Sequence, residues 1–199
     1  MQLVFNVAAI AMVVILIWTP RRAGKLVSFG LAFLWFWVAV VYHLAFFWRI
    51  NPAAPFFVLI SLAAAEAFLW FGFFRPSLCF RSGMDARKIA GVFVVLFALA
   101  GYPIFGALLG HHYPAAPTFG LPCPTTIFTF GVLLMAARPL PWLVLVAPMV
   151  WAAIGAAAAF SLGVTQDIGL LVMMVLGGYM LLSNQSPIEP PLKADGPRP

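Results

Sequence analysis

The sequence predicts an all-α fold, a polytopic membrane helix bundle with seven transmembrane helices, or six in the alternative arrangement. The first observation is the composition: of 199 residues, 64% are hydrophobic and only 8% are charged. Soluble domains carry about 25% charged residues, and a water-soluble chain of this length could not bury so much apolar surface. The second observation is that long apolar runs alternate with short segments containing proline, glycine and basic residues.

Seven apolar runs approach the length of about 20 residues that a helix needs to cross the hydrocarbon core. They cover Gln2–Thr19, Leu26–Trp48, Ala54–Phe74, Ile89–Leu109, Gly120–Ala137, Trp142–Phe160 and Asp167–Ser183. Proline and glycine at most of the joins indicate helix ends, and the short joins predict that consecutive helices pack as antiparallel neighbours. Six spans result if the first or the last run does not cross.

The basic residues predict the orientation of this bundle, which occupies residues 1–183. With the joins placed alternately on the two sides, ten Lys and Arg residues fall on one side and Arg49 alone on the other. The positive-inside rule makes the first side cytoplasmic, so we expect the N-terminus outside and the C-terminus inside. Residues 184–199 are polar and rich in proline, which predicts a disordered cytoplasmic tail.

The net charge of +6 does not indicate nucleic-acid binding, because the basic residues are scattered between apolar runs. The lipid bilayer is the expected partner of this chain. A homo-oligomer and a partner in a larger membrane complex both remain open.

Glu66 is the most informative polar residue, because it lies about twelve residues into the third apolar run, near the expected midplane. An ionised carboxylate there costs several kcal/mol, so the group is neutral, paired or hydrated. One interpretation is a proton- or cation-binding site on a transport path. The other is a protonated carboxyl group that hydrogen-bonds to a neighbouring helix and moves nothing.

The three histidines fall toward the expected external face. His43 lies near the outer end of the second run, and His111 and His112 follow the fourth. Together they could bind a metal, bind haem, or relay protons toward Glu66. The alternative is that they anchor helix ends at the membrane interface beside Trp and Tyr residues.

A helix is expected to begin within Pro122–Thr126, with Thr125 as a capping residue. The positive end of a helix dipole favours the thiolate form, which makes Cys123 a candidate metal ligand or redox thiol. The alternative is a small buried residue packed against its neighbours. The metal candidates are Cys123, His111 and His112, and the transport-path candidates are Glu66, His43, Tyr42, Tyr102, Thr125 and Thr126.

Several activities are excluded by missing residues. We expect Lys25, Lys88 and Lys193 to lie outside the spans, which excludes a retinal Schiff base. The sequence has no GxSxG, P-loop or HExxH motif. We place Asp85 in a cytoplasmic loop and Asp167 at the end of the last run, which leaves no aspartate pair for a protease. No enzymatic activity and no cofactor are expected.

Three stretches of the chain carry a family resemblance. They are Tyr42-His43 with Phe46-Phe47 and Ile50-Asn51-Pro52-Ala53-Ala54, Glu66 in its alanine run, and Tyr113-Pro114 through Gly131 with the core PTFGLPCPTT. Together they resemble the bacterial multi-pass membrane proteins grouped as domain-of-unknown-function family 6064, over about residues 30–183. The resemblance implies a membrane protein and names no reaction or ligand.

The leading functional hypothesis is a small-solute, metal or proton transporter. Its path would open outside near Cys123 and the two adjacent histidines, pass His43 and reach Glu66 at the midplane. The rise per residue places His43 and Cys123 at similar depths, roughly 8–10 Å outside the midplane. The rival hypothesis is a structural or accessory subunit of a larger membrane complex.

Overall fold

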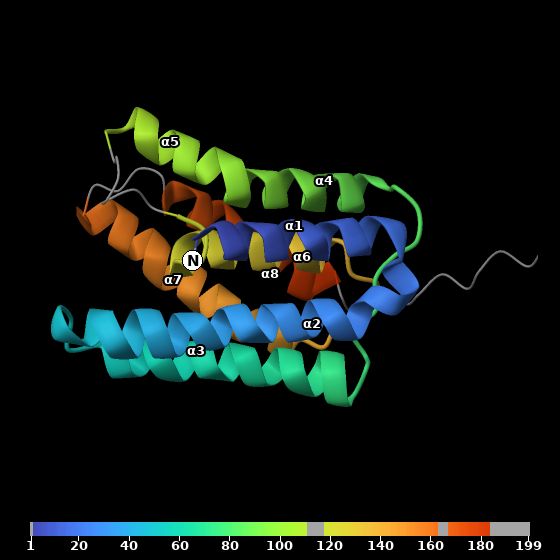
Figure 1. Cartoon of the computed structure of the whole chain (residues 1–199), viewed down its shortest axis with the longest axis horizontal. Helices are drawn as coiled ribbons and strands as arrows, with labels where there is room; N and C mark the ends of the chain where they lie inside the picture. Colours follow the sequence, from blue (N-terminus) through green and yellow to red (C-terminus); the bar gives the residue numbers. More distant parts are fainter. Residues whose placement is uncertain (1, 111–117, 163–166, 184–199) are drawn as a thin grey trace, which may run out of the picture.

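The computed structural model describes residues 2–110, 118–162 and 167–183, and these ranges contain helices and no β-strands. Figure 1 shows the helices lying side by side along the long axis of the molecule. The α-helices are α1 (Gln2–Trp18), α2 (Pro20–Trp37), α3 (Ala54–Phe68), α4 (Ala86–Leu96), α5 (Tyr102–Leu108), α6 (Pro122–Leu134), α7 (Leu143–Leu162) and α8 (Ile168–Ser183). The predicted all-α fold is confirmed.

Several α-helices continue without a break into a neighbouring helical segment, and we call each continuous helix a rod. Three rods contain π-helical turns, in which the helix widens by one residue. Residues Val38–Phe46 continue α2, Leu69–Phe74 continue α3, and Phe97–Gly101 join α4 to α5. The last of these ends two residues before Pro103, which has no N–H for the normal helical hydrogen bond. The widened turn allows the rod to continue past this proline, and α5 leans away from the axis of α4 (Figure 1).

Each helical rod coincides with one of the predicted apolar runs. Within the described ranges, three rods are long and apolar enough to cross a membrane: Ala23–Arg49, Ala54–Phe74 and Ala86–Leu108. The other rods are shorter apolar helices. The crossing of all seven stays a prediction, and the expected disordered tail lies outside the described residues.

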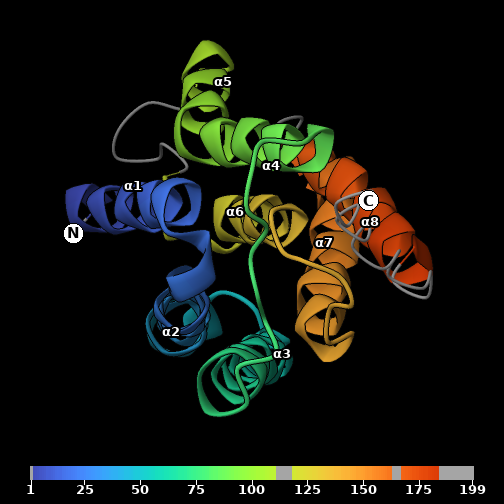
Figure 2. The same ribbon diagram turned by 90° about the vertical axis from the view of Figure 1, so that its right-hand side faces the viewer.

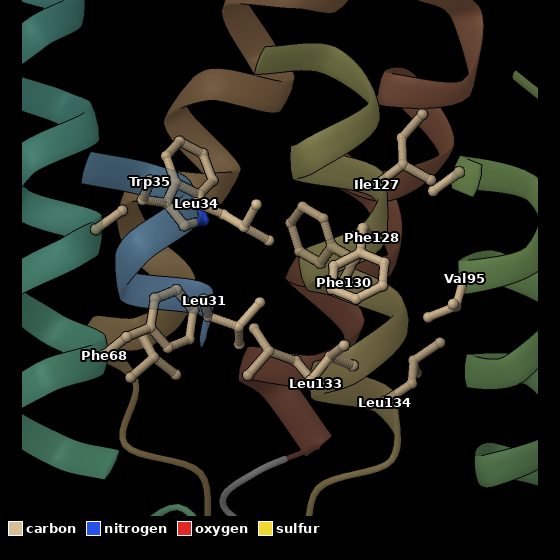
Figure 3. Close-up of a cluster of buried hydrophobic side chains, with 14 of the residues drawn as sticks. Leu31, Leu34, Trp35, Phe68, Val95, Ile127, Phe128, Phe130, Leu133 and Leu134 are labelled. Carbon is tan, nitrogen blue, oxygen red and sulfur yellow. The ribbon is translucent and has the colours of Figure 1, made fainter. Parts of the chain in front are cut away.

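Helix α6 occupies the centre of the bundle, as Figure 2 shows in the view along the helices. Every residue of α6 is buried except Cys123, which is half-buried. In Figure 3, Leu31, Leu34 and Trp35 of α2 face the α6 side chains Phe128, Phe130 and Leu133, with Phe68 of α3 beside them. A buried helix of this kind has no polar stripe, because no side of it faces water.

One buried hydrogen bond joins α2 to α6. The indole Nε1–H of Trp35 donates to Thr129 Oγ1 at 3.1 Å, and the Thr129 hydroxyl donates to the Thr125 carbonyl at 2.8 Å. Both side chains are inaccessible to solvent. An indole N–H buried without an acceptor is costly, so the threonine hydroxyl explains how a tryptophan fits in this apolar core.

We therefore expect Thr129→Val to lower the free energy of unfolding by about 1–2 kcal/mol, because it leaves the Trp35 N–H unpaired. Thr125→Val is the matched control on the same helix, since the buried Thr125 Oγ1 has no hydrogen-bond partner in the described ranges. Denaturant unfolding in detergent micelles, followed by circular dichroism, measures both. Equal effects of the two substitutions would contradict the assignment.

The contact between α4 and α6 is closest at two glycines. A Cβ built on Gly131 would lie 2.8 Å from Val95 Cγ2 and 2.9 Å from the Gly91 carbonyl oxygen. A Cβ built on Gly91 would lie 2.6 Å from the Gly131 carbonyl oxygen. The two backbones therefore approach to a distance that only glycine permits, as is common between membrane helices.

The structure corrects the expected position of two lysines. Lys25 lies in α2 and Lys88 in α4, both within rods that could cross a membrane. Lys88 is 2% exposed, and its Nζ donates to the carbonyls of Leu16 and Arg81, both at 3.2 Å. The sequence pattern failed here because a lysine in the first turns of a helix resembles a loop charge, and in the case of Lys88 tertiary packing also covers it.

Candidate functional site

The densest group of polar side chains is centred on Asp167, which directly precedes α8. The Tyr102 hydroxyl donates a short hydrogen bond to Asp167 Oδ1. The Cys123 thiol lies 3.6 Å from Asp167 Oδ2 and donates to it. Tyr102 belongs to α5 and Cys123 to the first turn of α6, so three helical segments meet at one carboxylate. We call Tyr102, Cys123 and Asp167 the polar cluster.

Tyr42 extends the polar cluster toward His43. The Tyr42 phenol lies within electrostatic range of Cys123 and Asp167. Its ring meets the imidazole of His43 edge-on, with the ring centroids 5.0 Å apart. Tyr42, which precedes His43 in the π-helical turn, thus connects the polar cluster to this buried histidine.

His43 is enclosed by aromatic rings. Its centroid lies 4.9 Å from the Trp151 ring and 5.6 Å from the Phe57 ring, and the side chain is fully buried. Neither imidazole nitrogen has a hydrogen-bond partner in the described ranges. A buried polar group is normally hydrogen-bonded, so an unpaired imidazole beside ionisable groups is a candidate for a functional role.

Glu66 occupies a different place. It is exposed and lines a groove of about 400 Å³ between α3 and α7. The lining residues are Ala63, Glu66, Ala67, Trp70, Phe71, Leu143, Val146 and Ala147. None of the other sequence-predicted site residues lines this groove, so the continuous path from Cys123 to Glu66 stays a prediction.

The two threonine candidates are buried within α6. Thr126 donates to the Pro122 carbonyl at 2.8 Å. Thr125 does not cap the helix as expected: α6 begins at Pro122 after Leu121, and the Thr125 N–H already makes a helical bond to the Leu121 carbonyl. The helix starts one turn too early for Thr125 to serve as its cap.

The proposed metal ligands are only partly placed. His111 and His112 lie outside the described residues, so their relation to Cys123 stays a prediction. Among the residues that are described, no three His, Cys, Asp and Glu side chains gather as a metal site would require.

Sequence reasoning missed Asp167, which forms the centre of the polar cluster. Its position at the start of an apolar helix indicates an interfacial residue, and no local pattern indicates that Tyr102 and Cys123 pack against it. The separation along the chain is 65 residues for one pair and 44 for the other. Only the packing of α5, α6 and α8 brings these groups together.

Residues 1–188 match the model of a family of unknown function, DUF6064. The chain belongs to this family. The match confirms the resemblance seen in the sequence and extends it over almost the whole chain. No curated protein and no solved structure matches this DUF6064 protein.

The chemistry available to this DUF6064 protein follows from the donors at Asp167. A carboxylate offers about four lone-pair positions, and Tyr102 and Cys123 account for two of them. Positions not taken by donors in the described ranges could accept a proton or coordinate a small cation. A phenol, a thiol and a carboxylate that share hydrogen bonds can also exchange protons among themselves.

Proposed function

We propose that this protein is a multi-pass bacterial inner-membrane protein that moves protons or small cations across the bilayer. Its N-terminus would lie outside and its C-terminus in the cytoplasm. The observation that supports this most directly is the polar cluster, in which one carboxylate accepts hydrogen bonds from Tyr102 and Cys123 in a chain otherwise built of apolar helices. Ionisable groups inside apolar helix bundles are costly to keep and mark ion or proton pathways.

In this proposal Asp167 is the group that gains and loses the cation. The Tyr102 hydroxyl and the Cys123 thiol compensate its charge when the cation leaves, because both donate hydrogen bonds to it. Tyr42 and the buried His43 extend the same polar region toward α7 through the contact between His43 and Trp151. His43 would act as a relay, since neither of its nitrogens is occupied by a hydrogen bond from the described residues.

The test is a flux measurement in proteoliposomes. Vesicles that contain a trapped pH-sensitive dye report proton flux under an imposed gradient, and ion-sensitive dyes report a panel of metal ions. We expect Asp167→Asn to reduce the specific flux at least about tenfold, because the amide cannot carry a proton or a full negative charge. Tyr102→Phe should reduce it less, since it removes one hydrogen bond to the carboxylate and leaves the charge.

Two controls separate a specific loss from misfolding. Asp195→Asn removes the same charge from the polar C-terminal segment and should leave the flux unchanged. The same assay is applied to Cys123→Ser, which removes the thiol donor of the polar cluster. Cys79→Ser, at an exposed cysteine, is the control for that variant. Flux no greater than that of empty vesicles, from wild-type protein that elutes as a folded species, would overturn the proposal and favour an accessory subunit.

A further inference from the structure

Glu66 presents a free carboxylate in the middle of an apolar rod. It lies twelve residues after Ala54, in a rod that ends at Phe74 and is long and apolar enough to cross a membrane. Its side chain makes no hydrogen bond or salt bridge with the part of the chain that the structure describes. An ionised carboxylate that faces the hydrocarbon without a partner is strongly disfavoured, and a positively charged group from outside the chain would stabilise it there.

The groove around Glu66 is otherwise apolar. Trp70 and Phe71, in the π-helical continuation of α3, form one end of its wall, and the two alanines Ala63 and Ala67 leave space next to the carboxylate. Aromatic faces attract cations, and a volume of about 400 Å³ falls within the range of small-molecule sites. Arg75 lies against the Trp70 ring at 5.3 Å from its centroid and makes no salt bridge with Glu66.

We propose that the groove between α3 and α7 binds a lipophilic organic cation, whose charge pairs with the Glu66 carboxylate and whose apolar body fills the groove. This site is separate from the polar cluster and does not depend on it. Low dielectric around the groove strengthens the charge pair, and the apolar walls exclude small hydrated ions.

The dimensions of the groove favour a compact ligand over a partner helix. The lining residues of α3 and its π-helical continuation run from Ala63 to Phe71, which is roughly 12 Å along a helix axis. A partner transmembrane helix would follow its neighbour over the roughly 30 Å of the hydrocarbon core. On α7 the lining residues are confined to its first two turns, Leu143–Ala147.

The experiment uses two ions of the same shape and opposite charge, tetraphenylphosphonium and tetraphenylborate. Binding of each to the full-length protein in detergent micelles is measured by calorimetry and by equilibrium dialysis. We expect wild-type protein to bind the cation and not the anion. Glu66→Gln should weaken cation binding at least about tenfold, because it removes one member of a desolvated charge pair.

Two further variants test the charge and the groove separately. Glu189→Gln removes a glutamate from the C-terminal segment and should leave binding unchanged. Ala63→Trp, at an exposed position, keeps the carboxylate but fills the groove and should also abolish binding. Thermal stability near that of wild type shows that each variant is folded.

Three results would overturn the proposal: no cation binding by the wild type, equal binding by Glu66→Gln, or equal binding of the two ions. Loss of cation binding in Glu66→Gln with unchanged flux in the proteoliposome assay would support this site while leaving the polar cluster as the transport site. Loss of flux in Asp167→Asn with intact cation binding would show that the groove binds its cation independently of the polar cluster.

Discussion

Replacing Gly131 with valine should lower the free energy of unfolding by about 3 kcal/mol, at the upper end of the usual cost of overpacking. The reason is that the new side chain meets the α4 backbone at two points. Its Cβ would lie 2.9 Å from the Gly91 carbonyl oxygen and 2.9 Å from the Val95 nitrogen. Backbone atoms in the middle of a helix cannot rotate away, so α4 would have to move off α6.

The matched control is Gly178→Val in α8. A Cβ built on Gly178 meets no atom within 4 Å, so the same substitution, also inside a helix, is expected to be nearly neutral or slightly stabilising. Titration with a denaturing detergent, followed by circular dichroism, measures both variants. If the two unfold at the same detergent fraction, the close approach of α4 and α6 does not exist in the folded protein.

Replacing Lys88 with methionine should cost about 2–3 kcal/mol, because it removes a charged donor from two carbonyls. The Leu16 carbonyl depends on the Lys88 ammonium as its hydrogen-bond donor, and the sequence shows why. The residue four positions later, which would normally donate to that carbonyl, is Pro20 and has no N–H. The Lys88 ammonium takes this place and lies at the C-terminal end of α1, where a positive charge is favourable.

Lys25→Met serves as the control, since Lys25 is exposed and lies 5.9 Å from the ring centroid of Phe73. We expect it to change stability by less than about 1 kcal/mol. Thermal unfolding in micelles gives both values. A Lys88→Met variant as stable as Lys25→Met would show that water or another group satisfies the two carbonyls.

The sequence predicts the positions of the helices well because two strong signals coincide in it. Long apolar runs indicate helices in a bilayer, and residues such as Pro52 and Gly120 mark the joins between them. The π-helical turns have no such signal. Val38–Phe46 reads as an ordinary apolar helix, and the widened turn shifts every later side chain around the axis.

The candidate site was predictable only in part, because its members come from distant positions. Tyr102 and Cys123 stood out as polar groups within apolar runs, whereas Asp167 appeared as an ordinary residue at a helix end. The role of Glu66 also changed with the structure. Its position along the third apolar run suggested a central path, and its position around the helix axis places it on an outer groove.

The burial of α6 has a consequence for how the protein is made. Helix α6 packs against α4, α7 and α8, and the last two follow it in the chain. During synthesis, α6 therefore leaves the ribosome before part of its final environment exists. The packing around α6 is therefore complete only after α7 and α8 have been synthesised.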